Sequence, residues 1–206
     1  MILIQRVIQE SYYCNEDVVF LAKDLLGKLI TLKNADGFVS AIITETEAYA
    51  GVTDKASHAY GGRRTPRNEV MYGSGGMAYV FLCYGIHYLF NVVTGPKNTP
   101  HAVLIRGVIP LEGIDLMLAR RKLNSIDNRG FNGPGKVTSA LGINLSHNGA
   151  SLTGSAIQIK EIGVAVTTSQ IKVSKRIGVN YAEEDALLPY RFELLDKMIV
   201  KKNVLL

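Results

Sequence analysis

The chain has 206 residues, of which 47% are hydrophobic and 20% charged, and its formal net charge is +5. This composition is typical of a globular protein and excludes intrinsic disorder and collagen-like repeats. No apolar run reaches the roughly 20 residues that a membrane-spanning helix needs, and the first residues lack the pattern of a signal peptide. The sequence therefore predicts a cytoplasmic protein without membrane contact. Its 2 cysteines form no CxxC pair, which argues against a zinc ribbon or a thioredoxin-like site.

The apolar pattern predicts elements that follow one another without a linker, which favours one domain over residues 1–206. A long loop over 51–76, of a length that is usually functional or disordered, separates two groups of elements. The expected strands cover 28–32, 37–49, 77–83, 88–94, 102–108 and parts of 152–192, and the expected helices cover 15–26, 113–122 and 134–141. This succession predicts a mixed α/β (α+β) fold, with a curved, largely antiparallel sheet, packed helices and a protruding β-hairpin.

Two carboxylates, Glu45 and Glu47, lie on one face of the strand expected over 37–49, together with Tyr49, because side chains alternate along a strand. Two charges are costly in a core, so the strand is expected at the rim of a cleft, where one carboxylate can act as a general base. An exposed edge strand that uses charge to prevent association explains the pair as well. Taken alone, the pair favours this second interpretation.

Asp54 and His58 follow in the predicted loop. With Glu45 and Glu47 they could form a divalent-metal site, since carboxylates and imidazole are common ligands. Their spacing is not specific for such a site. A single histidine in a loop is more often a surface residue or a hydrogen-bonding residue.

Two alternating strands meet at Gly85-Ile86, where glycine in the first central position suits a type II′ turn. This prediction puts Tyr84, Ile86 and His87 at or beside the tip of a hairpin. Large side chains at an exposed tip are typical of a wedge that enters the minor groove and parts a base step. A tip that folds onto the core is the alternative.

The positive charge is unevenly distributed. Residues 1–54 carry 4 basic and 8 acidic side chains, residues 55–106 carry 6 and 1, and residues 107–206 carry 13 and 9. The central segment predicts either a surface that meets phosphates or a solvated basic face. The basic groups around the expected hairpin are Arg63, Arg64, Arg67 and Arg106, and a glycine-rich segment that starts a predicted helix ends in Lys136.

Seven motifs occur in the order found in the alkyladenine (3-methyladenine) DNA glycosylases, and the resemblance extends from about residue 21 to 192. They are Glu45-Thr-Glu-Ala-Tyr49, Asp54-Lys-Ala-Ser-His58, Gly62-Arg-Arg-Thr-Pro-Arg-Asn68, Tyr79-Val-Phe-Leu-Cys-Tyr-Gly85, Asn91-Val-Val93, Val103-Leu-Ile-Arg106 and Asn132-Gly-Pro-Gly-Lys136. The resemblance implies a compact, bacterial-type DNA repair enzyme that releases a damaged purine from DNA.

The resemblance also implies a role for each matched residue. Glu47 resembles the general base that activates a water, and Arg106 and the backbone carbonyl of Ile177 resemble the groups that help to hold this water. The residues that resemble the base pocket are Tyr49, Ala56, His58, Phe81 and Asn91. Tyr84 resembles the side chain that fills the gap left by a flipped base, and the other expected DNA contacts are Ile86, His87, Arg63, Thr65, Arg67 and Lys136.

The partner implied is double-stranded DNA that contains damaged purines, bound by a monomer that works at the nucleoid and needs no metal or cofactor. The reaction would leave an abasic site. Phe81 and His87 stand where the best-known members carry tyrosine, so the order of preference among 3-methyladenine, 7-methylguanine, hypoxanthine and ethenoadenine stays open. The alternatives are a metal-dependent nuclease and a nucleic-acid-binding module without chemistry.

Overall fold

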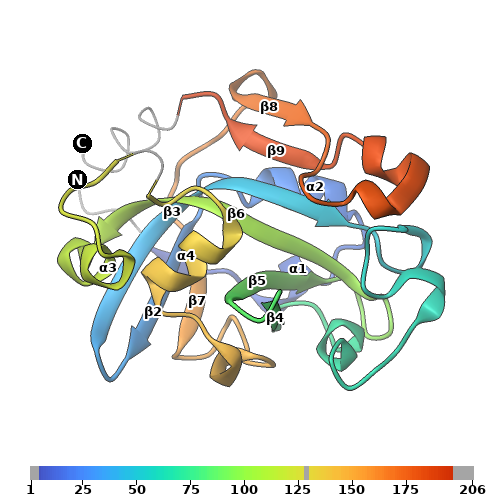
Figure 1. The fold of residues 1–206 in the computed structure, drawn as a ribbon, viewed down its shortest axis with the longest axis horizontal. Coiled ribbons are helices and arrows are strands. Elements are labelled where there is room, and N and C mark those ends of the chain that lie inside the picture. Colours follow the sequence, from blue (N-terminus) through green and yellow to red (C-terminus); the bar gives the residue numbers. More distant parts are fainter. Residues whose placement is uncertain (1–4, 128–129, 197–206) are drawn as a thin grey trace.

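The computed structural model describes residues 5–127 and 130–196 (Figure 1). Within them the strands form one curled antiparallel sheet in the order β1-β7-β2-β3-β6-β5-β4, and β9 pairs with both β3 and β8. The strands are β1 (Arg6–Val7), β2 (Leu29–Asn34), β3 (Gly37–Tyr49), β4 (Ala78–Cys83), β5 (His87–Thr94), β6 (His101–Glu112), β7 (Ile157–Glu161), β8 (Ile171–Ser174) and β9 (Arg191–Leu194). The predicted mixed α/β fold is confirmed.

Short α-helices pack on this sheet. In the described residues they are α1 (Glu10–Tyr13), α2 (Val18–Asp24), α3 (Ile114–Arg121) and α4 (Pro134–Leu141). The helix expected over 15–26 is shorter than predicted, because the Asp17 carboxylate accepts a hydrogen bond from the backbone N–H of Phe20 and caps the helix at its start. No helix of the described ranges has the length and apolar character needed to cross a bilayer.

Much of the chain between the long strands forms short 3₁₀ segments. The loop expected over 51–76 contains three of them, and the C-terminal part contains β7, β8 and β9 instead of continuous strands. A 3₁₀ segment connects β8 to β9. Within it Glu183 has a positive φ of 50°, which interrupts the helical conformation. The 3₁₀ segments are Gly51–Thr53, Tyr60–Gly62, Glu69–Tyr72, Leu145–His147, Thr168–Gln170 and Asn180–Leu187.

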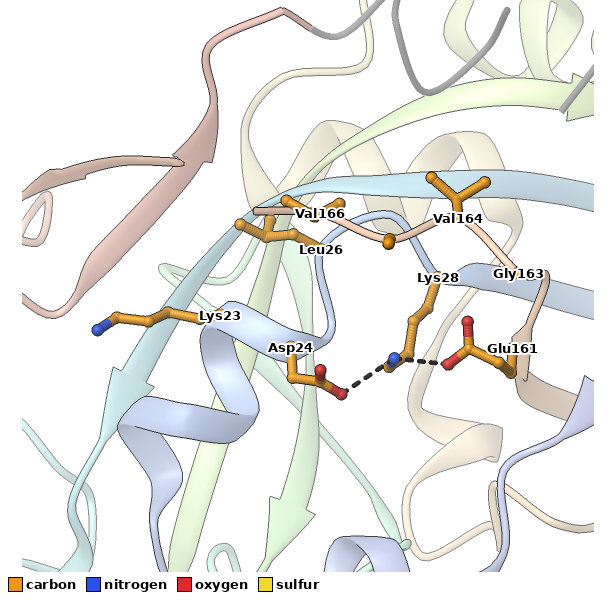
Figure 2. Close-up of a pocket in the computed structure, with 9 residues that line it drawn as sticks. Lys23, Asp24, Leu26, Lys28, Glu161, Gly163, Val164 and Val166 are labelled. Carbon is orange, nitrogen blue, oxygen red and sulfur yellow. Dashed lines mark hydrogen bonds and ion pairs between the residues drawn. The ribbon is translucent and has the colours of Figure 1, made fainter. Parts of the chain in front are cut away.

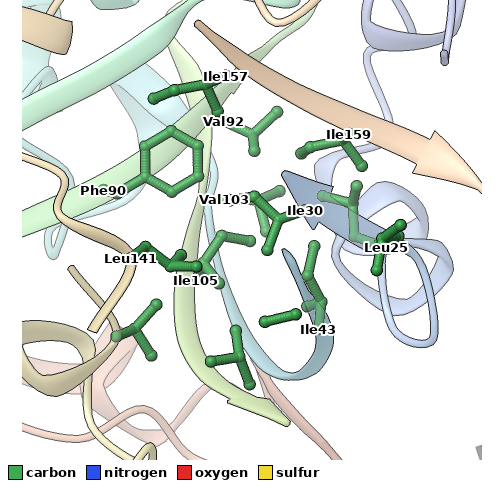
Figure 3. Packing of buried hydrophobic residues seen from close by; sticks show 14 of the residues in the cluster. Leu25, Ile30, Ile43, Phe90, Val92, Val103, Ile105, Leu141, Ile157 and Ile159 are labelled. Carbon is green, nitrogen blue, oxygen red and sulfur yellow. The ribbon is translucent and has the colours of Figure 1, made fainter. Parts of the chain in front are cut away.

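The main hydrophobic cluster lies between the sheet and the helices α2 and α4 (Figure 3). Ile30, Phe90 and Ile105, from three different strands, are fully buried in it, together with Leu25 at the end of α2 and Leu141 of α4. The alternating apolar residues of the predicted strands thus supply one face of the sheet to the core. Strands β3 and β6 extend across most of the molecule and connect this core to the region of the predicted site (Figure 1).

The pairing of β3 with β6 is irregular where the two predicted carboxylates lie. Glu45 pairs with Gly107 but Thr46 pairs with Ile105, so the pairing skips Arg106. Such a bulge twists the strand and redirects side chains. Gly107 permits the close approach, because a Cβ at this position would lie 2.9 Å from the Cβ of Glu45. The bulge therefore brings the Arg106 side chain to the carboxylates of β3.

The hairpin formed by β4 and β5 has an exposed tip, but its turn differs from the prediction. The backbone N–H of Ile86 donates to the carbonyl of Cys83, and Tyr84 and Gly85 occupy the central positions with φ of 50° and 73°. Positive φ at both positions is typical of a type I′ turn, so the predicted type II′ turn at Gly85-Ile86 is wrong. Tyr84 is 90% and Ile86 72% exposed, which excludes a tip folded onto the core.

Helix α4 supports the base of this hairpin. The Thr138 hydroxyl donates to the carbonyl of Tyr88 at 2.6 Å. Gly135, in the first turn of α4, lies against His87, since a Cβ at this position would be 2.8 Å from the imidazole ring. Any larger residue at position 135 would have to displace His87.

Phe90→Ala should destabilise the protein by about 3–5 kcal/mol, because it leaves a cavity in the main core. The control is Leu82→Ala on the paired strand, where the side chain is 38% exposed and the expected loss is within about 0.5 kcal/mol. Urea unfolding followed by circular dichroism measures both. Equal losses for the two variants would contradict the assignment of Phe90 to the core.

Candidate active site

Glu47 is a buried carboxylate held by three kinds of donor. Its Oε1 accepts the backbone N–H of Ile177 at 2.8 Å, and its Oε2 accepts the Tyr49 hydroxyl at 2.9 Å. The Arg106 guanidinium approaches at 3.3–3.4 Å. The side chain of Glu47 is 0% exposed, whereas Ile177 is 52% exposed, so the carboxylate lies directly beneath the surface. The structure thus brings together Glu47, Tyr49, Arg106 and Ile177, although Ile177 contributes its N–H and not its carbonyl to the contact seen.

Glu45 lies beside Glu47 but is bound differently. Its Oε1 accepts Arg106 Nε at 3.0 Å and Arg191 Nε at 2.7 Å. Burial alone would raise the pKa of Glu45, but the hydrogen bonds and charges of Arg191 and Arg106 outweigh it and lower the pKa. For Glu47 burial dominates and raises the pKa, against the charge of Arg106 and the donors on Ile177 and Tyr49. Two carboxylates whose pKa values are pushed apart are typical of an acid–base site.

Two aromatic rings, those of Tyr79 and Phe81, form a cluster with His58. His58 Nδ1 lies 2.8 Å from the Tyr79 hydroxyl, and its ring centroid lies 4.6 Å from that of Phe81. The guanidinium of Arg67 covers the Phe81 ring at 5.2 Å. Burial, followed by the charges of Arg67 and Arg63, lowers the pKa of His58 to about 4. The imidazole is therefore neutral at pH 7.

Asn91 and Ala56 are both buried. Asn91 pairs with Tyr79 across the hairpin strands, and its Nδ2 donates to the Tyr79 carbonyl at 3.2 Å. Ala56 packs with Val179 beside Tyr49. Its N–H donates to Asp54 and its carbonyl accepts from the Tyr181 hydroxyl, so both of its backbone groups have partners within the protein.

The residues expected to contact DNA lie around the hairpin. Arg63 is exposed, and the backbone N–H and hydroxyl of Thr65 both donate to the Oδ1 of Asn68. The buried Asn68 also donates from Nδ2 to the carbonyls of His58 and Arg63, so one amide orders this loop. Lys136 lies in the first turn of α4. The tip residues Tyr84, Ile86 and His87 are exposed to solvent.

Several residues of this region were not predicted from the sequence. Tyr79 alternates with Phe81 on β4, so strand periodicity could have indicated it. Asn68 lies within one of the quoted motifs but has no local signal of its role. Arg191 binds Glu45 from β9, which is far away in the sequence, and no pattern in the sequence connects the two residues.

The four residues considered as possible metal ligands are not assembled as ligands. Glu45 and Glu47 bind Arg106, Asp54 binds Arg176, and His58 contacts Tyr79. Throughout the described ranges, no group of three or more His, Cys, Asp or Glu side chains is arranged to hold a metal ion. Each of these carboxylates already has a cationic partner, which disfavours the metal-dependent nuclease.

A cavity of about 400 Å³ lies apart from this cluster, between the end of α2 and the segment after β7 (Figure 2). Lys28 occupies its wall and bridges Asp24 at 3.0 Å and Glu161 at 2.8 Å. None of the residues predicted for the site lines this cavity.

Comparisons with known proteins identify the family of the chain. The model of the methylpurine-DNA glycosylase family matches residues 12–198. The chain belongs to this family. A relative from Chlamydia felis, named a 3-methyladenine DNA glycosylase, is 49% identical over 91% of this chain and 96% of its own length. A relative from Desulfitobacterium hafniense with the same name is 46% identical over 95% of this chain and 98% of its own.

A third relative of that name, from Bacillus mycoides, is 45% identical over 88% of this chain and 93% of its own length. The resemblance found in the seven motifs is thereby confirmed. As a methylpurine-DNA glycosylase the protein is a DNA repair enzyme, a hydrolase that acts on the N-glycosidic bond of DNA. This overturns the alternative of a binding module without chemistry.

Lowering the pH from 7 towards 4 should destabilise the protein more than it destabilises a His58→Gln variant. The pKa of His58 is about 4 in the folded chain, below the ordinary histidine value of 6.5 that applies to the unfolded chain. Between these values the unfolded chain binds more protons, so the stability falls as the pH falls, by at most about 1.4 kcal/mol per pH unit. Unfolding curves at several pH values and an NMR titration of the imidazole test this. A His58 that titrates near 6.5 would contradict the burial of the ring.

Proposed function

We propose that Glu47 is the general base of this glycosylase and that its substrate is a damaged purine nucleotide flipped out of duplex DNA. The observation that carries the proposal is the buried Glu47 carboxylate, held by Arg106, Ile177 and Tyr49 and close beneath the surface. Burial raises its pKa, which makes it a better proton acceptor than a solvated carboxylate. Glu45 has two arginine partners that lower its pKa, which favours a structural role for it.

In the proposed reaction a water attacks C1′ of the flipped nucleotide and the bond from C1′ to the base breaks. Glu47 takes a proton from the water, and the electron pair of the broken bond leaves with the base. The products are a free base and an abasic deoxyribose. An alkylated purine that already carries positive charge leaves as a neutral base, so it needs no protonation. The contacts to Glu47 come from Arg106, Tyr49 and the Ile177 backbone, and none comes from a lysine in the described residues, which supports hydrolysis without a covalent enzyme intermediate.

The base pocket that we propose is lined by Tyr49, His58 and Phe81, with Ala56 and Asn91 at its margin. Aromatic faces stack on an electron-poor purine. The lowered pKa of His58 matters here, because a neutral imidazole does not repel a cationic base. The Asn91 amide is proposed to select against purines with an exocyclic amino group at the wrong edge. The substrates are then alkylated or deaminated purines.

The proposed wedge is the hairpin tip. Tyr84 would fill the gap left by the flipped nucleotide, with Ile86 and His87 beside it. The backbone of Tyr84 is already in the left-handed region, so the turn presents the ring to solvent without any rearrangement. The DNA backbone would be met by Arg63, Thr65, Arg67 and Lys136. We propose that one copy of the chain is sufficient for this arrangement.

Glu47→Gln should still bind duplex DNA, but its release of base should fall by about 10²- to 10⁴-fold, because the amide cannot accept the proton from water. Single-turnover base release from a duplex with one 7-methylguanine measures the rate, and a gel-shift assay measures binding. The control is Glu112→Gln, an exposed carboxylate at the far end of β6 that accepts from Ser40.

A Glu47→Gln enzyme that releases base at the native rate would refute the assignment of the base. The same assay in EDTA distinguishes the nuclease, since loss of activity on chelation would indicate a metal-dependent reaction. Strand cleavage at the abasic product would contradict simple hydrolysis.

Tyr84→Asn should lower base release from duplex DNA by about 10-fold or more, because stacking of an aromatic residue on bases contributes about 1–3 kcal/mol. Asparagine tolerates the positive φ at this position, so the turn is retained. The loss should be smaller on a single-stranded oligonucleotide, where flipping leaves no gap to fill. Phe38→Asn, at the opposite end of β3 from Glu47, is the control. Equal losses on both forms of DNA would argue against a wedge.

A further inference from the structure

Arg176 and Asp54 form an ion pair that is buried beside the candidate active site. Their side chains are 0% and 1% exposed, and the pair is bidentate, with Nη2 donating to Oδ1 at 2.8 Å and Nη1 to Oδ2. Arg176 also donates to the carbonyls of Ala48 at 2.9 Å and Asp185 at 3.1 Å. The guanidinium therefore binds three separate segments of the chain at once.

Arg176 is connected to both oxygens of Glu47. The residue after it, Ile177, donates its backbone N–H to Glu47 Oε1. Its guanidinium lies 4.8 Å from the ring centroid of Tyr49, and the Tyr49 hydroxyl donates to Glu47 Oε2. Tyr190 covers the guanidinium at 5.3 Å. Two of the donors on Glu47 thus depend on where Arg176 lies.

Asp54 anchors the other side of this arrangement. Besides Arg176, its carboxylate accepts the backbone N–H groups of Ala50 and Ala56, both at 3.0 Å. These bonds fix the chain immediately after Tyr49. Burying an ion pair costs desolvation energy that can exceed the attraction between the charges, so stability alone explains such a pair poorly. Precise placement of neighbouring groups explains it better.

We propose that Arg176, held by Asp54, is a positioning residue for the general base: it keeps the Tyr49 hydroxyl and the Ile177 N–H on the two oxygens of Glu47 and places a positive charge behind them. The inference rests on the proposed role of Glu47. The other charged or titratable groups around Glu47 are Arg106, Glu45 with its partner Arg191, and Tyr49. Among these, Arg106 touches the carboxylate directly, whereas Arg176 acts through its neighbours.

The test separates position from charge by comparing Arg176→Lys with Arg176→Met. The substrate is a duplex with one 7-methylguanine, because a cationic base needs no protonation. The acidic limb of the pH profile then reports groups of the enzyme, which are Glu47 and His58, and His58 is the same in every variant compared. Arg176→Met should lower single-turnover base release by about 10- to 100-fold and move the acidic limb to higher pH, since a cation that favours the ionised base is lost. Arg176→Lys keeps the charge, so its limb should stay near that of the wild type while its rate falls.

Lys28→Met is the control, because it also removes a largely buried cation from its ion pairs, but at the cavity wall near α2 (Figure 2). This side of β3 is opposite Glu47, as the Thr46 hydroxyl donates to the carbonyl of Ala22 in α2. Circular dichroism and unfolding curves give the folded fraction of each variant. Lys28→Met should lose stability without a change in the pH profile of the folded enzyme.

Rates and pH limbs of the folded Arg176 variants equal to those of the wild type would overturn the inference. If Arg176→Met does not fold, Arg176→Lys decides: a native rate in the folded protein overturns the positioning role, and a reduced rate with a retained limb supports it. The proposal that Glu47 is the general base is tested separately, because an active Glu47→Gln enzyme would refute it. An inactive Glu47→Gln together with unchanged Arg176 variants would refute only the positioning role.

Discussion

The candidate site depends on the burial of carboxylates in the middle of a long strand. Glu45 and Glu47 are both nearly inaccessible to solvent, and an ionised carboxylate without partners in such a place costs several kcal/mol. The cations that compensate for this cost come from distant parts of the chain: Arg106 from β6 and Arg191 from β9, with Arg176 behind Tyr49. The site can exist only once β6 and β9 are paired with β3. The charge balance of the site therefore depends on the pairing of the sheet.

The partners are divided unequally, and this gives the two carboxylates different chemistry. Glu45 shares one oxygen between two arginines, which keeps it ionised. Glu47 has one arginine at longer distance and two neutral donors, so burial has the larger effect on its pKa. The bulge at Arg106 makes this division possible, because the redirected guanidinium reaches both carboxylates from one position. A regular pairing of β3 with β6 would instead place residue 106 opposite a single residue.

The local features of the structure could be predicted from the sequence, and the long-range ones could not. Alternation along one strand is enough to put Glu45, Glu47 and Tyr49 on one face, and the hairpin with its exposed tip follows from two alternating runs. The same reasoning expected an exposed rim where the structure has buried ion pairs, since nothing in the strand itself indicates Arg106 or Arg191. The sequence predicts the turn one residue too late, because an aromatic residue at positive φ is uncommon and the rules for type I′ turns do not select Tyr84.

Many of the charges counted along the sequence are paired with one another in the folded chain. The acidic excess of residues 1–54 does not form an acidic surface here, because Glu45, Glu47 and Asp54 are buried against arginines. The basic excess of residues 55–106 is reduced in the same way: Arg106 is buried, Lys55 binds Glu183 and Glu184, and Arg64 binds Glu69.

Within the described ranges no ion pair with a carboxylate engages Arg63 or Arg67, two of the three arginines that follow His58 in the loop leading to the hairpin. These two arginines lie close to the ring cluster of His58, Tyr79 and Phe81, where they can attract phosphates. A count of charges along the sequence overestimates how many basic groups can meet DNA, because three of the six central ones, Lys55, Arg64 and Arg106, pair with carboxylates within the protein. The remaining arginines of the loop, Arg63 and Arg67, lie beside the proposed base pocket, where phosphate contacts would position the DNA without reading its sequence.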